Sequence, residues 1–194
     1  MMMNTMTEPA PSSAPRVRPA EARDIASIRG IYAHHVRHGL ASFEETPPNA
    51  AEIARRWKKA IRRGLPYLVA ESEGIVVGFA YANLFRERSA YRFAVENSVY
   101  IVPRLHRCGI GSILLDELIL RCEAAGYRQM VAVIGDSANI ASIALHRNKG
   151  FEMAGTLPGI GFKFGRWVDN VYMRRPLGAG EQAAPQEILK PNKK

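Results

Sequence analysis

The sequence contains little cysteine and no long apolar run, and both shortages narrow the class of protein. Cys108 and Cys122 are the only cysteines among 194 residues. They are too few and wrongly spaced for a zinc site, and too few for a disulfide framework in a chain of this length. No apolar run approaches the ~20 residues that cross a bilayer, and the first residues lack the basic start and apolar segment of a signal peptide. We therefore expect a cytoplasmic protein with no membrane partner and no metal site.

Periodic apolar patterning is missing from both ends of the chain. Residues 1–15 hold four methionines and three prolines among small polar residues, and residues 178–194 are polar and contain proline. Such segments bury too little apolar surface to fix a conformation. The sequence therefore predicts a disordered tail at 1–15, one domain at 16–177 and a second disordered tail at 178–194. With 47% apolar residues in the whole chain, the domain is large enough to bury a core.

Positive charge is in excess, with a formal net charge of +9 at pH 7. A basic domain attracts nucleic acid or a phosphorylated cofactor. The densest basic cluster lies on one face of a helix predicted to begin at Asn49, and it consists of Arg55, Arg56, Lys58, Lys59, Arg62 and Arg63. Because no exposed aromatic residues alternate with these cations, we interpret the cluster as a solvated helix face and expect no nucleic-acid partner.

The most informative stretch covers residues 98–122. Residues 99–102 are β-branched or aromatic and predict a buried strand, which Pro103 ends because it has no N–H for the ladder. A helix over 109–125 follows, because apolar residues recur there every three or four positions, namely Ile110, Ile113, Leu114, Leu118, Ile119 and Cys122. A buried strand thus leads almost directly into a helix with one buried face.

Two glycines, Gly109 and Gly111, lie at the start of this helix. Glycine lets the backbone approach a ligand closely, and the first helical turn leaves amide N–H groups unpaired at the positive end of the helix dipole. These features predict a site for phosphate or pyrophosphate. A dinucleotide-binding loop would need a third glycine near Ile113, and a P-loop would need Gly-Lys-Ser/Thr at 111–113. Neither is present. A third pattern, in which other strands precede this strand and the pyrophosphate belongs to coenzyme A, fits the family resemblance described next.

Residues 106–111, His-Arg-Cys-Gly-Ile-Gly, resemble a known family signature. In the GNAT superfamily of N-acetyltransferases, Gln/Arg-x-x-Gly-x-Gly/Ala follows directly after a strand. Both glycines match that signature, whereas His106 stands where the family has glutamine or arginine. The resemblance implies that acetyl-CoA binds at this loop.

The order of the predicted elements defines the fold class. Periodicity predicts two helices, at 21–38 and from Asn49, and then three strands, at 67–71, at 75–83 and ending at 102. A helix at 109–125, a strand at 129–134 and a helix at 139–149 follow, and two final strands lie within 151–173. These elements make a mixed α/β (α+β) domain. The resemblance implies the GNAT fold, a central mixed, mostly antiparallel sheet flanked by helices and splayed between its fourth and fifth strands. The splay would leave backbone groups free to pair with the pantetheine arm of the cofactor.

Further motifs resemble the phosphinothricin and methionine sulfoximine (methionine sulfone) acetyltransferase branch of this superfamily. They are Val-Ala-Val-Ile-Gly at 131–135, Asn139, Ser142, Leu-His at 145–146, Gly-Phe at 150–151, and Gly-Phe-Lys-Phe-Gly-Arg-Trp at 161–167 with Asp169. The resemblance implies cofactor contacts at Val99, Tyr100, Ile101, Arg107, Cys108, Gly109, Ile110, Gly111, Ser112, Asn139 and Ser142. We expect Cys108 to face the cofactor without acting as a nucleophile, and Cys122 to fill the core.

Acetyl transfer to an amine needs a base for the ammonium proton and a stabiliser for the oxyanion. Glu96 stands at the position that the branch uses for a general base, and the alternative is a strand-end carboxylate in solvent. His146 stands where the superfamily often has a tyrosine that protonates the leaving thiolate. A histidine near neutrality suits that role, and a structural helix histidine is the alternative. The expected oxyanion donors are backbone N–H groups of residues 99–101.

The resemblance also implies an acceptor site. Arg88 matches a position that holds the acceptor's carboxylate or its tetrahedral oxygenated group, and a guanidinium suits either one. Phe43, Arg86 and Tyr91 are expected to wall the pocket, with surface or core positions as the alternative. Three further histidines are interpreted as a solvated cluster and not as a metal site, namely His34, His35 and His38.

The sequence thus predicts an acetyl-CoA-dependent N-acetyltransferase that acts by direct attack in a ternary complex. The expected acceptors are small and amino-acid-like, such as methionine sulfoximine, methionine sulfone or phosphinothricin. Two alternatives stay open, namely acetylation of another small amine or a protein N-terminus, and an acyl-CoA-binding regulator without turnover. Glu96 speaks against the regulator. The resemblance also implies a homodimer.

Overall fold

A single twisted sheet organises the molecule. The computed structural model describes residues 14–185, so the parts of the predicted tails at 1–13 and 186–194 lie outside the described residues. Within 14–185 the sheet has seven strands, β1 Arg16–Pro19, β2 Tyr67–Ser72, β3 Ile75–Leu84, β4 Ala94–Ile101, β5 Gln129–Gly135, β6 Glu152–Lys163 and β7 Arg166–Pro176. Their order across the sheet is β1-β2-β3-β4-β5-β7-β6, and all neighbours are antiparallel except β4 and β5.

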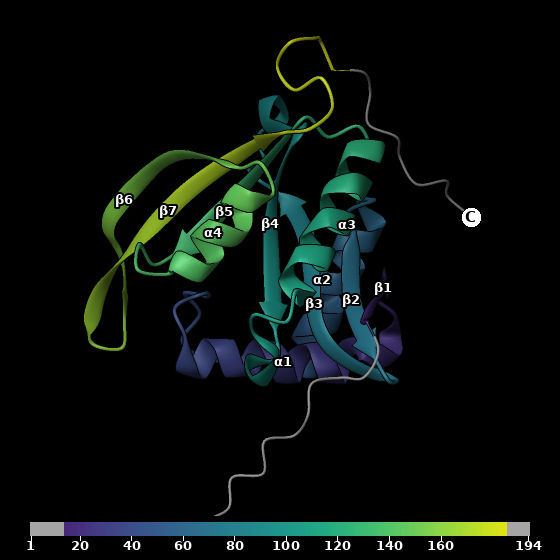
Figure 1. Ribbon diagram of the computed structural model, residues 1–194, viewed down its shortest axis with the longest axis vertical. Helices are drawn as coiled ribbons and strands as arrows, with labels where there is room; N and C mark the ends of the chain where they lie inside the picture. Colours follow the sequence, from purple (N-terminus) through teal and green to yellow (C-terminus); the bar gives the residue numbers. More distant parts are fainter. Residues whose placement is uncertain (1–13, 186–194) are drawn as a thin grey trace, which may run out of the picture.

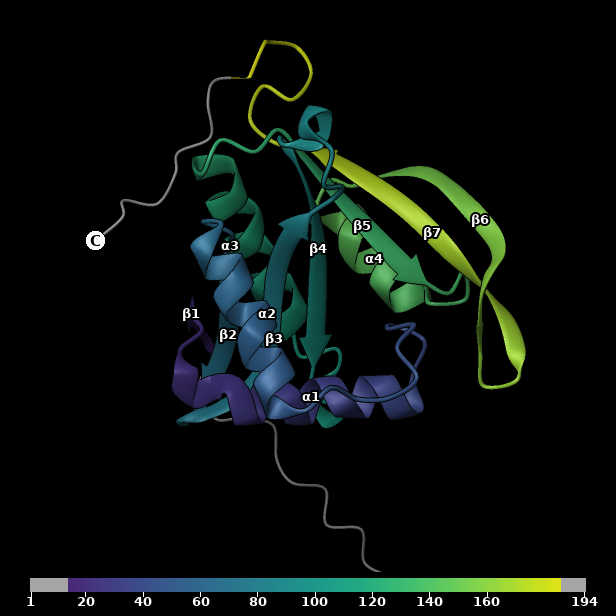
Figure 2. The same ribbon diagram turned by 180° about the vertical axis from the view of Figure 1, so that it is seen from behind.

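Helices cover both faces of this sheet. The four α-helices within the described range are α1 Ile25–His38, α2 Ala50–Arg62, α3 Ile110–Ala124 and α4 Ile140–Asn148. Helices α3 and α4 lie over one face (Figure 1), and α1 and α2 lie on the opposite side, which Figure 2 shows from behind. Strands β6 and β7 extend away from the rest of the sheet as a long hairpin (Figure 1). This arrangement confirms the predicted mixed α/β architecture.

The helix starts follow from their capping residues. The Asn49 side chain accepts a hydrogen bond from the Glu52 N–H at 2.9 Å, so α2 begins where the capping-box spacing predicts. In the same way, Asn139 accepts from the Ser142 N–H at 3.2 Å and starts α4. Gly109 precedes α3 with φ of +78°, a left-handed conformation that glycine adopts without steric cost.

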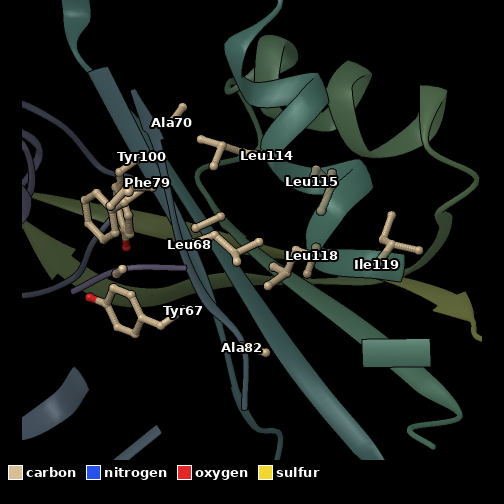
Figure 3. Close-up of a cluster of buried hydrophobic side chains, with 14 of the residues drawn as sticks. Tyr67, Leu68, Ala70, Phe79, Ala82, Tyr100, Leu114, Leu115, Leu118 and Ile119 are labelled. Carbon is tan, nitrogen blue, oxygen red and sulfur yellow. The ribbon is translucent and has the colours of Figure 1, made fainter. Parts of the chain in front are cut away.

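The main core lies between α3 and the sheet. Six α3 side chains are buried, namely Ile110, Leu114, Leu115, Leu118, Ile119 and Cys122. The prediction included Ile113 in place of Leu115, but Ile113 is only half-buried. Figure 3 shows Leu114, Leu115 and Leu118 on one side of the central strands, with Tyr67, Phe79 and Tyr100 on the other side. Burying each such leucine contributes about 1.5–3 kcal/mol.

The sheet splays between β4 and β5, as predicted. The parallel ladder runs only from Ala94 opposite Gln129 to Asn97 opposite Ala132. Beyond this point, residues 98–101 of β4 pair only with β3, and residues 133–135 of β5 pair only with β7. The gap between the two strands therefore opens toward the carboxyl end of β4.

Strand β1 was not predicted by the sequence analysis. Its four residues pair with β2, and Arg18 bonds Asp24 at 2.7 Å and Glu71 at 3.0 Å. An arginine in a short strand obscures the alternation of apolar and polar residues that marks a strand. Its aliphatic stem favours burial, whereas its charged guanidinium favours solvent. The predicted helix at 21–38 starts with a 3-10 turn over Ala22–Asp24.

Residues 178–185, which the sequence assigns to the C-terminal tail, form turns against the domain. Arg128 donates to the Gly180 C=O at 3.1 Å and to the Ala183 C=O at 3.0 Å, and Arg174 bonds Glu181 at 2.7 Å. Among residues 14–185, no helix combines the length and apolar character needed to span a membrane.

Candidate active site

Strand β4 separates two cavities because successive side chains point to opposite faces of a sheet. On the α1 and α2 side, Glu96 lines a cavity of about 420 Å³, which we call the α2 cavity. On the α3 and α4 side, Asn97 lines a cavity of about 720 Å³ that enters the gap between β4 and β5, which we call the splay cavity. Adjacent residues of one strand therefore face two different spaces.

The splay cavity brings together most of the residues predicted to bind the cofactor. Ten of the eleven line it, namely Val99, Tyr100, Ile101, Arg107, Gly109, Ile110, Gly111, Ser112, Asn139 and Ser142. Cys108 does not line the cavity; it is exposed, and its thiol donates to the His106 C=O at 3.7 Å. Elements far apart in the sequence thus meet at the carboxyl end of β4.

The glycine loop is shaped for close approach. A Cβ at Gly111 would lie 3.2 Å from the Leu145 side chain, so glycine lets the start of α3 pack against α4. The Ser112 N–H already donates to the Gly109 C=O at 3.0 Å. Earlier amides of the turn have no helical acceptor and lie at the positive end of the α3 dipole, where they suit an anion.

Backbone groups of β4 line the gap itself. Val102 donates to the Val77 C=O at 3.0 Å, and hydrogen-bonding direction alternates along an antiparallel ladder. The N–H and C=O groups of Val99 and Ile101 therefore point away from β3, toward the gap. The Ile101 C=O pairs with His35 Nε2 at 2.8 Å, which leaves the other groups for a ligand.

The prediction of a solvated histidine cluster is wrong for His35. This side chain is half-buried, and burial lowers the pKa of its imidazole. Its ring stacks on His106 with centroids 6.0 Å apart, and His34, His35 and His38 all line the splay cavity. The contact between α1 and the end of β4 is long-range, so helix spacing alone does not reveal it.

His146 is buried in the wall of the splay cavity, at 4% exposure. Its Nδ1 lies 2.8 Å from the Ser142 C=O, and its Nε2 lies 3.0 Å from Asn97 Oδ1. The Phe151 ring meets the imidazole edge-on, with centroids 5.0 Å apart. Burial lowers the pKa of His146, because the charged form loses its hydration.

Glu96 lies half-buried in the wall of the α2 cavity. Burial raises the pKa of its carboxyl, and the positive charge of Arg86 partly offsets this effect. The cavity also has an aromatic wall, in which Tyr67 stacks on Tyr81 with centroids 4.9 Å apart and Phe79 lies beside both. A carboxylate with a raised pKa beside a cavity is positioned to accept a proton from a bound ligand.

The basic face of α2 forms part of this second cavity. Four of its six cations line the space; Arg55, Lys59 and Arg63 stay exposed, as a solvated face requires, whereas Arg56 is half-buried. These cations form ion pairs with glutamates from three segments. Arg56 pairs with Glu44 at 2.6 Å, and Arg55 pairs with Glu52 at 2.7 Å. Lys59 and Arg63 both pair with Glu87, at 3.7 and 3.5 Å. Lys59 and Arg63 thus share a single carboxylate.

The four predicted acceptor-binding residues lie outside the walls of both cavities. Arg86 stacks over the Phe85 ring at 5.1 Å, and Tyr91 meets the same ring edge-on at 5.9 Å. Arg88 is exposed and directly precedes the 3-10 turn Ser89–Tyr91. Burial raises the pKa of the Glu96 carboxyl, and the positive charge of Arg86 lowers it in part. The roles of these residues stay predictions.

Phe43 is the fourth of these residues, and it packs at the end of the gap. A Cβ at Gly135 or Gly161 would lie 2.6 or 2.2 Å from its ring, so both glycines make room for it. The same loop is held by Lys163, which is 2% exposed and donates to the Gly39 C=O at 2.9 Å and the Ser42 C=O at 2.6 Å. Sequence reasoning missed Lys163; the available signal was a lysine between two phenylalanines in a strand.

Comparison with known proteins identifies the family. Residues 17–172 match the family model described as an acetyltransferase (GNAT) domain. The chain belongs to the GNAT acetyltransferases. Among curated relatives, this acetyltransferase is 52% identical over 170 residues to a phosphinothricin N-acetyltransferase of Alcaligenes faecalis, covering 88% of this chain and 86% of that protein.

Two further relatives extend this likeness. An L-methionine sulfoximine/L-methionine sulfone acetyltransferase of Pseudomonas aeruginosa is 40% identical over 162 residues, covering 83% of this chain and 94% of the relative. The crystal structure of a GNAT superfamily phosphinothricin acetyltransferase from Sinorhizobium meliloti in complex with AcCoA superposes with a TM-score of 0.87 at 50% identity. It covers 89% of this chain and 94% of that chain.

Acetyl-CoA is the co-substrate of this family, and the splay cavity of the acetyltransferase fits it. The amides at the start of α3 suit a pyrophosphate, and the outward-facing groups of Val99 and Ile101 suit the amides of a pantetheine arm. The Asn139 side chain, which caps α4 and lines the cavity, offers a further amide. The cavity therefore has donors and acceptors where an extended, partly anionic cofactor needs them.

Proposed function

We propose that the protein transfers the acetyl group of acetyl-CoA to the amine of a small amino-acid-like acceptor, by direct attack in a ternary complex. The acceptors are of the phosphinothricin, methionine sulfoximine or methionine sulfone type, on which the relatives are named to act. One observation carries the proposal, namely that adjacent residues of β4 line two separate cavities, the splay cavity with the glycine loop and the charged α2 cavity with Glu96.

In this proposal, one face of β4 serves the cofactor and the proton donor, and the other face serves the acceptor and the base. When bound in the splay cavity, acetyl-CoA supplies an acetyl thioester. Glu96 accepts the proton of the acceptor's ammonium group, and its raised pKa makes it a stronger base than an exposed glutamate. On the other face, His146 supplies a proton, and its position in the cavity wall brings Nε2 beside β4.

The acceptor occupies the α2 cavity, whose cationic side chains suit an acceptor with an acidic group. Arg88 binds the acceptor's carboxylate or its tetrahedral oxygenated group with its planar guanidinium. Arg86, Tyr91 and Phe43 complete the acceptor site from the adjoining loops. These roles require the loop at 85–93 to approach the cavity mouth, where Glu87 already lies.

An acceptor panel tests this proposal. Thiol release from acetyl-CoA is measured with phosphinothricin, methionine sulfoximine, methionine sulfone, simple alkyl amines and a peptide with a free N-terminus. Turnover of the amino-acid-like compounds, with mass spectrometry showing one acetyl group on their nitrogen, is the expected result. Faster turnover of the peptide or alkyl amines would replace the acceptor class, and acetyl-CoA binding without any turnover would favour a regulator.

The proposal includes a homodimer. Large apolar side chains are exposed on β6 and β7 and the turn between them, including Leu157, Ile160, Phe162, Phe164 and Trp167. Several large exposed apolar side chains on one hairpin are typical of a protein interface, and the symmetric homodimer is the commonest oligomer. Sedimentation should give a dimer that Trp167→Glu converts to a monomer, and a monomeric parent protein would refute this part.

We also propose a cytoplasmic location and no nucleic-acid or membrane partner. Both cysteines are free thiols, which fits a reducing compartment. The cations of α2 that line the α2 cavity are paired with Glu44, Glu52 and Glu87, which reduces the positive field available to a phosphate backbone. Tight binding to a random duplex at moderate salt would overturn the nucleic-acid part.

A further inference from the structure

Asn97 and His146 form a buried hydrogen-bond chain that crosses from β5 through β4 to α4. Asn97 is 6% exposed and His146 is 4% exposed. Asn97 Nδ2 donates to the Val131 C=O at 3.2 Å, Asn97 Oδ1 lies 3.0 Å from His146 Nε2, and His146 Nδ1 lies 2.8 Å from the Ser142 C=O. The chain begins and ends on a backbone carbonyl, which can only accept.

The Val131 carbonyl fixes the orientation of the Asn97 amide. Because this carbonyl is an acceptor, the NH₂ group of Asn97 must face it. The reversed amide would place two oxygens 3.2 Å apart in a buried setting. Asn97 therefore presents its oxygen, a pure acceptor, to His146.

The imidazole of His146 thus lies between two acceptors. A neutral imidazole has only one N–H, so it can satisfy either Asn97 Oδ1 or the Ser142 C=O, but not both. The Ser142 hydroxyl, at 3.5 Å from Nδ1, is too distant to resolve this conflict with a strong hydrogen bond. Only the doubly protonated imidazolium satisfies every member of the chain.

We infer that Asn97 is a positioning residue that holds a proton on Nε2 of His146 beside the gap between β4 and β5, so that His146 enters the reaction as a proton donor. This inference rests on the proposed function. The Nε2–H bond breaks and an S–H bond forms on the thiolate released by acetyl transfer, while Nδ1–H stays on the Ser142 C=O. The neutral imidazole then faces Asn97 Oδ1 without a donor, which favours regaining a proton from solvent.

Among the surroundings of His146, Asn97 has the main influence on the protonation of the imidazole. The hydrogen-bond and ring partners of the imidazole among the described residues are Asn97 from β4, Ser142 from its own helix and Phe151 just after that helix, and none of these three is titratable. Burial opposes the charged form, and the hydrogen-bond chain favours it. Burial is the larger of the two effects, so loss of the hydrogen bond to Asn97 should lower the pKa of His146 further.

Nuclear magnetic resonance of the full chain tests this inference without any cofactor. With ¹⁵N-labelled histidine, long-range proton–nitrogen spectra give the tautomer and pKa of His146. Asn97→Leu removes the acceptor at similar size and should lower this pKa by about one unit. Asn97→Asp replaces it with a carboxylate and should raise the pKa. Asn148→Leu, at an exposed position of the same helix, should leave it unchanged.

Equal His146 pKa values in the parent and in both Asn97 variants would overturn the inference. If Asn97→Leu does not fold, the upward shift in Asn97→Asp still decides the matter. In the activity assay, the pH at which the rate decreases with rising pH should move in the same direction as each His146 pKa. Failure of the parent protein to acetylate any acceptor would refute the proposed function and leave the resonance result standing.

Discussion

Glu96 and His146 lie on opposite sides of β4, and burial changes their proton affinities in opposite directions. On the α2 side, loss of hydration raises the pKa of the Glu96 carboxyl. On the α4 side, the same loss lowers the pKa of the His146 imidazole. Both shifts disfavour the charged form, so a carboxylate becomes a stronger base and an imidazolium becomes a stronger acid. One physical effect thus prepares two groups for opposite proton transfers.

The two faces differ in the partners that they give these groups. Glu96 lies in a cavity lined by cations and aromatic rings, where Arg86 acts on it through its charge. His146 has only neutral partners, two of which are acceptors at hydrogen-bond distance. The acceptor face therefore relies on charge, and the cofactor face on hydrogen-bond geometry. The predictions below test whether the two faces can be disabled separately.

The largest effect is expected from Glu96→Gln. Glutamine preserves the shape and hydrogen bonding but cannot accept the proton, so turnover at pH 7 should fall by about 10²–10⁴-fold. The acetyl-CoA Kd, measured by calorimetry, should stay that of the parent, because Glu96 faces the other cavity. Glu117→Gln on α3 serves as a control for losing a carboxylate elsewhere. A loss of both turnover and cofactor binding would mean that the two faces are coupled.

On the cofactor face, Gly109→Glu should remove the rise in Tm that acetyl-CoA causes, because a carboxylate would occupy the anion site. Saturating ligand at about 100 times its Kd stabilises a protein by about 2.7 kcal/mol. Because Gly109 has φ of +78°, any side chain there costs about 1–2 kcal/mol. Gly109→Ala has the same strain without the charge, so it should keep the ligand-induced rise. Equal rises in the glutamate and alanine variants would place the cofactor elsewhere.

A smaller effect concerns acceptor binding alone. Arg88→Ala should raise the acceptor KM about tenfold, since a charged hydrogen bond contributes about 1.5–3 kcal/mol. Lys59→Ala removes a cation that lines the α2 cavity but is half-exposed and shares Glu87, so we expect less than about a threefold change. A larger change for Lys59→Ala would transfer the anion-binding role from the loop to α2.

The smallest effect is a gain in stability for Glu96→Gln. A carboxyl whose pKa is raised by folding binds protons more tightly in the folded state, so the parent protein loses stability as the pH rises through the folded pKa. The glutamine variant does not titrate. Thermal melts should therefore show a higher Tm for the variant at pH 7.5, with the difference vanishing near pH 4. A lower Tm at pH 7.5 would show that the carboxylate is stabilised in the fold.

The sequence predicted those parts of the site that depend on contiguous residues. The strand, the glycines and the helix of residues 99–124 follow one another directly, so their propensities and spacing specify the cofactor loop. The caps at Asn49 and Asn139 are equally local. The splay between β4 and β5 came from the family resemblance, because no local pattern encodes where two strands stop pairing.

Long-range pairing explains what the sequence did not reveal. Asn97 and His146 are 49 residues apart, and Lys163 bonds a carbonyl 121 residues before it. The sequence did not reveal the ion pairs of the α2 cations, because two of their partners, Glu44 and Glu87, lie on loops whose positions only the folded chain determines. Strand β1 escaped detection because four residues with two arginines carry too little periodicity.

The pH dependence of single-turnover acetyl transfer tests the central claim, that a base and an acid act from opposite faces of β4. For the parent protein, the rate should fall at low pH as Glu96 becomes protonated, and it should fall again as the pH rises through the lowered pKa of His146. Glu96→Gln should lose the decrease that Glu96 causes at low pH, show the acceptor amine's own ionisation in its place, and keep the decrease caused by His146, whereas His146→Gln should lose that second decrease. If both variants kept the two-sided profile of the parent protein, neither residue would be the group that titrates, and the account would be contradicted.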